Sequence, residues 1–204
     1  VDKTTGESLY YVDPDNGDWS TTTDYNTAMQ ADCGSTLAKV YGGFGTSLNL
    51  YGFDFSVQFS YQLGGRVYDG TYQALMHTGS ANTAGTGWSK DILDAWSPSN
   101  PDSDIPRLNA GDDLNQKDSD RFLVSSNYLS VNNVTLGYTF PAKWTKKARI
   151  AGLRIYVTGD NLHVFSARKG LDPRMYLGSG SSTTSGNYTY TAMRNISGGI
   201  TLTF

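Results

Sequence analysis

The sequence predicts an all-β fold, in which antiparallel strands form part of a transmembrane β-barrel. Several segments alternate between apolar and polar residues at period two, as strands with one apolar and one polar face do. The links between these segments are alternately long and short, and successive links of an up-and-down barrel lie on opposite rims. Only 38% of the 204 residues are apolar, while 14 Tyr and 23 Gly are high counts. A barrel gives this composition because only every second strand residue is apolar.

The segment that organises the chain is a predicted hairpin of strands at 122–140 and 150–161. From Asn133 the alternation is strict, and Pro141 ends it because proline cannot donate to a ladder. The second strand places Arg154 and Asp160 on the face opposite its apolar residues. A charged face suits a water-filled interior, with the apolar face turned to lipid.

Three further strands are predicted at 39–50, 53–63 and 192–204. The strand at 53–63 has the cleanest alternation and matches the ~9–11 residues that a tilted strand needs to cross a bilayer. The long links are 1–38, 64–121 and 162–191, and the short links are 51–52 and 141–149.

The long links are expected to be mostly irregular. We expect a short strand at 8–12 and a short helix at 89–96 with Ser89 as its N-cap. The acidic stretch at 13–18 and the acidic run Asp112–Asp120 each have oxygen ligands that calcium could use. Neither has the standard spacing, so solvated turns are the preferred interpretation and no metal site is predicted.

The sequence contains no pattern that indicates an enzyme or a cofactor site. His77 and His163 are isolated, and Cys33 is the single cysteine, which excludes an internal disulfide. The formal net charge of −3 gives no reason to expect nucleic acid. Candidate ligand or partner contacts in the long links are four aromatic residues, whose flat faces suit sugar rings: Tyr72, Trp88, Trp96 and Tyr188. The competing interpretation is that these rings pack the loops together.

Four stretches and the final strand carry a family resemblance. They are "VYGGFGTSLNLYGFDFSVQFSYQLGGRVYD" (40–69), "WSPSNPDSDIPRLN" (96–109), "YLSVNNVTLGYTFP" (128–141), "LRIYVTGDNLHVFSARKGLDP" (153–173) and "GGITLTF" (198–204). Together they resemble the C-terminal part of a SusC-like (RagA-like) TonB-dependent outer-membrane transporter of Bacteroidetes. The stretch at 13–18 departs from the family's fuller acidic motif.

The resemblance implies a 22-stranded barrel with a plug domain, both mostly outside residues 1–204. It implies import of a glycan or oligopeptide, with a SusD-like surface lipoprotein outside and the TonB complex acting through the N-terminal part. In the final strand, Ile200, Leu202 and Phe204 match the signal read by the barrel-assembly machinery. The C-terminus is expected in the periplasm and the long loops outside the cell, so that a label should reach Ser181 but not Lys146.

Five strands are fewer than the about eight that the smallest barrels need, so we expect the rest of the barrel upstream. The alternative class is a secreted soluble β-sandwich with a carbohydrate-binding or adhesive role. A sandwich must cover its apolar stripe with a second sheet, whereas a barrel exposes an uncharged stripe to lipid. The stripes of 53–63 and 196–204 carry no charge, which favours the barrel.

Overall fold

The computed structural model describes residues 1–79, 87–111, 116–167, 170–175 and 191–204. These residues divide into two compact units. The loop unit contains Val1–Gly34 and Tyr68–Val124, and the sheet unit contains Ser35–Val67 and the described residues of Ser125–Leu177 and Thr189–Phe204.

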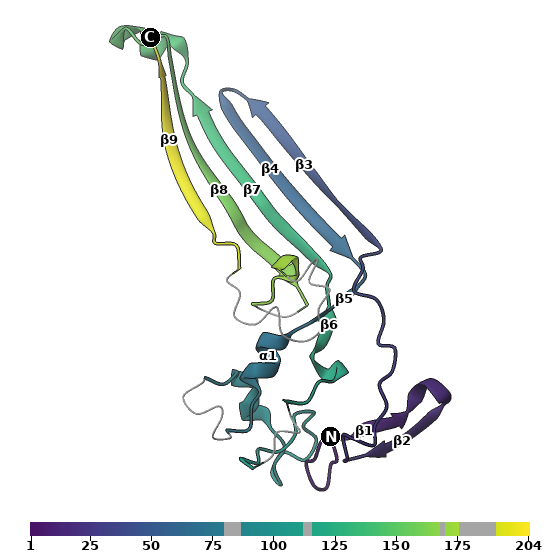
Figure 1. The fold of residues 1–204 in the computed structure, drawn as a ribbon. Coiled ribbons are helices and arrows are strands. Elements are labelled where there is room, and N and C mark those ends of the chain that lie inside the picture. The colour runs from purple at the N-terminus through teal and green to yellow at the C-terminus, as the bar shows by residue number, and fades with distance from the viewer. Residues whose placement is uncertain (80–86, 112–115, 168–169, 176–190) are drawn as a thin grey trace. The chain divides into compact units, whose positions relative to one another are not determined.

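The sheet unit is built on one five-stranded antiparallel sheet (Figure 1). Its strands lie side by side in the order β3 (Val40–Leu50), β4 (Phe53–Leu63), β7 (Tyr128–Thr139), β8 (Gly152–Ser166) and β9 (Asn195–Thr203). Every neighbouring pair is antiparallel. The order follows the sequence once β5 and β6 are set aside, which is the up-and-down arrangement expected.

The register aligns the apolar residues of all five strands on one face, called here the apolar face. Phe55 of β4 pairs with Leu48 of β3 and with Leu136 of β7. Leu136 pairs in turn with Val157 of β8. The opposite side, called here the polar face, carries the Asp, Asn, Thr and Arg side chains that alternate with them.

A one-residue bulge in β7 keeps the apolar side chains of that strand on the apolar face along its whole length. The register between β4 and β7 shifts between Gln58 and Phe59, which leaves Asn132 of β7 as an extra residue. A one-residue bulge reverses the facing of all later side chains. The apolar positions of β7 accordingly change from Leu129 and Val131 before the bulge to even-numbered residues after it.

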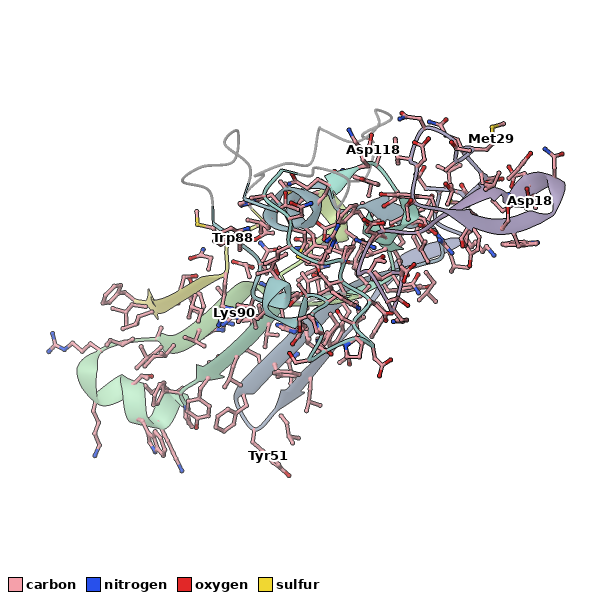
Figure 2. All side chains as sticks on the ribbon, turned by 90° about the horizontal axis from the view of Figure 1, so that it is seen from below. Asp18, Met29, Tyr51, Trp88, Lys90 and Asp118 are labelled. Atoms are coloured by element: carbon pink, nitrogen blue, oxygen red, sulfur yellow. The ribbon has the colours of Figure 1, made fainter. Side chains whose placement is uncertain are left out.

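Both short connections lie at the same end of the sheet as the C-terminus (Figure 1). The first is the turn at Tyr51 and Gly52, whose φ values of 49° and 89° are those of a two-residue hairpin turn that matches strand twist. Figure 2 shows the Tyr51 side chain at its tip. The second connection contains a short helix, α2 (Ala142–Thr145), and a 3-10 turn, Lys146–Ala148.

The loop unit contains a small hairpin and a compact apolar core. Strand β1 (Tyr10–Asp13) and strand β2 (Asp18–Thr22) flank the 3-10 turn η1 (Pro14–Asn16). The core is formed by Met76, Ile92 and Phe122. They come from the end of α1 (Gly70–Leu75) and from the 3-10 helices η3 (Lys90–Asp94) and η5 (Asp120–Phe122).

Several expected boundaries are corrected. The segment expected as a strand at 122–140 contains β6 (Leu123–Ser125), which forms a two-stranded sheet with β5 (Arg66–Tyr68), and only then β7. Strand β8 continues to Ser166, beyond the expected end at 161. The helix expected at 89–96 is the shorter 3-10 helix η3, with Ser89 as its N-cap as predicted. None of the helices in the described ranges has the length and apolar character to cross a bilayer.

Candidate functional site

The polar face of the sheet carries an ion pair that reaches across three strands. From β8, Arg154 Nε donates to Asp54 Oδ1 of β4 at 3.0 Å, and Nη2 donates to Asp54 Oδ2 at 2.5 Å. Strand β7 lies between them, and its residue at this level is Gly137. A Cβ on Gly137 would lie 2.5 Å from each carboxylate oxygen of Asp54. Glycine at this position leaves the space in which the pair closes over β7.

The same network continues to β9. The Arg154 guanidinium carbon lies 4.9 Å from the centre of the Tyr156 ring, within the range of a cation–π contact. The Tyr156 ring in turn covers Gly199 of β9, where a Cβ would lie 2.5 Å from the ring's Cζ. Side chains from β4 and β8 thus cover a glycine on each of β7 and β9 at one level of the polar face.

A second polar group lies further along β7 and β8. Asn133 Nδ2 donates to Asp160 Oδ1 at 2.7 Å and to Thr158 Oγ1 at 3.1 Å. The hydroxyls of Thr158 and Thr135 are 2.9 Å apart. Half-buried carboxylate, amide and hydroxyl groups in rows suit contact with water and polar solute, and they are costly in a dry core.

Residues 170–175 contact the polar face near the Tyr128 end of β7. Arg174 donates to the Asp172 carboxylate at 2.9 and 2.7 Å and to Ser130 Oγ of β7 at 3.0 Å. Ser166 Oγ donates to the Leu171 carbonyl at 2.6 Å. Leu171, Asp172 and Ser130 are buried. Thus, this short segment covers the polar face at the end opposite to the short turns.

The apolar face has groups of aromatic rings at both ends, and between them mostly aliphatic side chains with the single ring of Phe55. At the turn end the rings of Phe53, Tyr138, Phe140 and Trp144 follow one another with centroid separations of 4.5, 4.9 and 6.3 Å. At the other end the ring contacts are Phe44–Phe59 (4.9 Å), Phe44–Tyr61 (6.2 Å) and His163–Phe165 (4.4 Å).

The side chains between the two groups are exposed although they are large and apolar. Leu48, Leu136, Ile155, Val157 and Ile200 are each between 43% and 67% exposed. An apolar surface that runs over five strands exceeds what a soluble monomer usually presents, and indicates contact with lipid or with a partner.

The predicted assembly residues lie on and beside this face. Ile200 and Leu202 are on the apolar face of β9, paired with Ile155 and Leu153 of β8. Phe204 follows the end of β9 and is 88% exposed. Their role in assembly stays a prediction.

The predicted loop contacts are not brought together. The Tyr72 hydroxyl donates to Asp91 at 2.8 Å while its ring packs on Phe122. The Trp96 indole donates to the Lys3 carbonyl at 3.1 Å. Trp88 stacks on His77 and is still 54% exposed, so among the described candidates it offers the most ring surface. Tyr188 lies outside the described residues.

The first acidic stretch considered for calcium is a capped turn. Asp13 accepts hydrogen bonds from the Asn16 backbone and side chain, and Asp18 accepts one from Ser20 N. Asp112 and Asp113 lie outside the described residues. Within the described ranges no three His, Cys, Asp or Glu side chains converge as a metal site would require.

Sequence reasoning missed the partnership of Asp54 with Arg154. Alternation places both on polar faces, yet it does not say which strands are neighbours when 64 residues separate β4 from β7. Gly137, inside an otherwise regular alternation, is the signal that could have found it, since a strand glycine often marks a close approach.

No protein-family model matches the chain. It is 28% identical over 148 residues to the TonB-dependent receptor P3 of Formosa agariphila, which is 72% of this chain and 14% of that relative. It is 30% identical over 137 residues to the TonB-dependent receptor SusC of Bacteroides thetaiotaomicron, 67% of this chain and 13% of that relative. The chain therefore spans about one seventh of the length of these curated relatives.

A solved structure of the RagAB peptide transporter has the same fold. The match has a TM-score of 0.73 at 24% sequence identity, and covers 100% of this chain and 22% of that chain. The two-faced antiparallel sheet thus corresponds to part of the RagA barrel. Over most of its length, the chain is homologous to the SusC-like and RagA-like TonB-dependent receptors of Bacteroidetes.

Proposed function

We propose that this chain is the C-terminal part of the barrel of an outer-membrane transporter that imports a glycan or an oligopeptide together with a SusD-like lipoprotein. In this proposal the apolar face contacts lipid and the polar face lines the interior of a barrel of about 22 strands. Homology to TonB-dependent receptors implies that the protein is located in the outer membrane. The observation that carries the proposal is the separation of apolar and polar side chains across five hydrogen-bonded strands, to which Thr46, His163 and Val164 are exceptions.

The spacing of the aromatic rings supports the lipid contact. From Phe53 to Tyr61 β4 advances about 27 Å at ~3.4 Å per residue. At a tilt of about 40° this corresponds to about 20 Å along the membrane normal, close to the ~25 Å of an outer-membrane barrel's apolar band. Groups of rings at the two margins and mostly aliphatic residues between them, with Phe55 as the exception, are the arrangement expected of such a band.

The alternative of a soluble sandwich has less support. A sandwich needs a second sheet of similar size over the apolar face. The two other sheets in the described part of the chain have two strands each.

The orientation is part of the same proposal. The short turns lie in the periplasm and the long connections outside the cell, as in other outer-membrane barrels. The loop unit is then the part of the chain that meets the lipoprotein and the incoming substrate.

Deletion of the full-length gene tests the function directly. Uptake of labelled oligopeptides and labelled oligosaccharides is measured in the deletion strain, with and without collapse of the inner-membrane proton gradient. We expect energy-dependent uptake of one of the two classes to fall to background and to return with the intact gene. If uptake of neither class changes, the proposal is wrong.

A further inference from the structure

The loop unit contains a small cavity beside its core. The cavity has a volume of about 200 Å³ and is lined by Tyr72, Met76, Ile92, Asp104, Ile105, Pro106 and Arg121. Two of its walls, Met76 and Ile92, belong to the buried core, and Tyr72 and Ile105 pack against that core. The walls are therefore fixed by the fold.

Two of the three polar side chains that line the cavity already have partners. The Tyr72 hydroxyl donates to Asp91 at 2.8 Å. Asp104 forms an exposed ion pair with Lys3 at 3.4 Å.

The third polar group, the guanidinium of Arg121, has neither a hydrogen bond nor an ion pair with the residues that the structure describes. Burial lowers the pKa of Arg121, and nearby negative or hydroxyl-bearing groups such as Tyr10, Asp120 and Asp104 offset this effect only in part. The Arg121 side chain is only partly buried, and none of its nitrogens is among the buried side-chain atoms that lack a partner in the described residues. Its guanidinium is therefore accessible to an anion that enters the cavity, and partial burial strengthens that pairing relative to one in open water.

The size and lining of the cavity limit what that anion can be. A dry cavity of about 150 Å³ accommodates one benzene molecule, so 200 Å³ holds about one branched aliphatic or aromatic side chain. Met76, Ile92, Ile105 and Pro106 give that side chain an apolar surround. The planar guanidinium matches the two oxygens of a carboxylate.

We propose that this cavity binds a carboxylate whose α-carbon carries an apolar side chain, as the C-terminal residue of an apolar-ended peptide does. Arg121 pairs with the carboxylate, and the side chain enters the cavity. The proposal concerns binding at the loop unit and does not rest on the transport function.

The test measures binding of three small probes to the purified full-length protein in detergent, by saturation-transfer NMR and calorimetry. N-acetyl-leucine has both the charge and the apolar group, N-acetyl-leucinamide lacks the charge, and glucuronate lacks the apolar group. We expect N-acetyl-leucine to bind at least about tenfold more tightly than either of the others. The proposal is overturned if the amide or glucuronate binds equally well, or if N-acetyl-leucine does not bind.

Substitutions of Arg121 then test whether its guanidinium is the group that pairs with the carboxylate of the probe. Arg121→Gln should weaken N-acetyl-leucine binding at least about tenfold, and Arg121→Lys, which keeps a charge without the planar fork, should recover part of the loss. Lys90→Gln removes an exposed cation of η3 from the same unit and should change nothing. Unchanged binding in Arg121→Gln, or Arg121→Lys no better than Arg121→Gln, contradicts the proposal. Because the probe comparison uses the unaltered protein, a folding defect in a variant does not decide the outcome.

Discussion

At the scale of single residues, two glycines decide how the polar face is built. Gly137 leaves room for the Asp54–Arg154 pair to close across β7, and Gly199 leaves room for the Tyr156 ring over β9. Glycine lowers strand propensity because it has no side chain to pack. Here this loss is offset by side chains from neighbouring strands that occupy the space.

Gly137→Ala should disrupt the ion pair. The new methyl group would lie 2.5 Å from both Asp54 oxygens and 2.7 Å from Arg154 Nη2, so the pair must separate. We expect a loss of up to about 1 kcal/mol in the free energy of unfolding, because the atoms that must shift are the ends of two partly exposed side chains and the change costs chiefly their ion pair. The measurement is urea unfolding of the full-length protein in lipid vesicles.

Gly152→Ala is the matched control for this change. Its methyl group would meet Thr203 at 3.6 Å, an ordinary contact, so we expect stability close to that of the unaltered protein. Equal stability of the two variants would contradict the role assigned to Gly137.

At the scale of elements, the strands could be predicted wherever alternation is unbroken. Strand β4 has the residues that the pattern indicated, because its eleven residues alternate without interruption. The predicted end of β8 was too early because Asn161, at a φ of 50°, interrupts the pattern, although pairing with β7 resumes at His163. Strand β2 was missed because its sequence, DWSTT, shows no apolar alternation.

The short elements could not be predicted for a different reason. Helix α1 has only six residues, too few for a periodic pattern, and its start depends on a cap from the Asp69 side chain to Tyr72 N. The cavity at Arg121 could not be predicted either, because its lining comes from four separate segments that only the fold brings together.

The orientation of the connections can be tested with single cysteines. With Cys33 replaced by serine, we expect Lys90→Cys in η3 to react with an impermeant maleimide on whole cells. Lys146→Cys, in the short connection after β7, should react only after the outer membrane is opened. The reverse pattern would overturn the proposed topology.

Phe204 allows the assembly role of the last strand to be separated from its contribution to stability. The side chain is 88% exposed, and burial of one Phe in lipid contributes roughly 1.5–3 kcal/mol, which is small for a whole barrel. By its resemblance to the assembly signal, Phe204→Ala should slow insertion several-fold while heat stability of the inserted barrel changes little. Pulse–chase of heat-modifiable protein measures the rate, and insertion at the normal rate would count against the signal.

At the scale of the whole molecule, the chain contains a five-stranded sheet with an exposed apolar face and a unit built of long connections. Five strands leave the sheet with two open edges, at β3 and β9. Unpaired backbone groups in hydrocarbon cost several kcal/mol each, so these edges require neighbouring strands in the membrane. This requirement, together with coverage of only 13–14% of its curated relatives, is the physical reason to assign the transport activity to a larger barrel.

Under the proposed function, we expect the loop unit to help hold a SusD-like lipoprotein. Trp88 is 54% exposed in the loop unit, and exposed Trp side chains often dominate interfaces. Trp88→Ala should reduce co-purification of the lipoprotein several-fold. Trp144, 58% exposed in the short connection after β7, is the control, and Trp144→Ala should leave co-purification unchanged. Unaltered co-purification in Trp88→Ala would remove this residue from the interface.

The central claim is that the apolar face contacts lipid while the polar face contacts water inside a barrel. A nitroxide scan of β4, one residue at a time from Phe53 to Leu63, measures this in the full-length protein in lipid vesicles. Collision with oxygen, which concentrates in lipid, and collision with a water-soluble nickel chelate are recorded at each position. We predict opposite period-two profiles, with oxygen highest at 55, 57 and 59 and nickel highest at 56, 58 and 60. Profiles without that alternation, or with the two reagents exchanged, would contradict the claim.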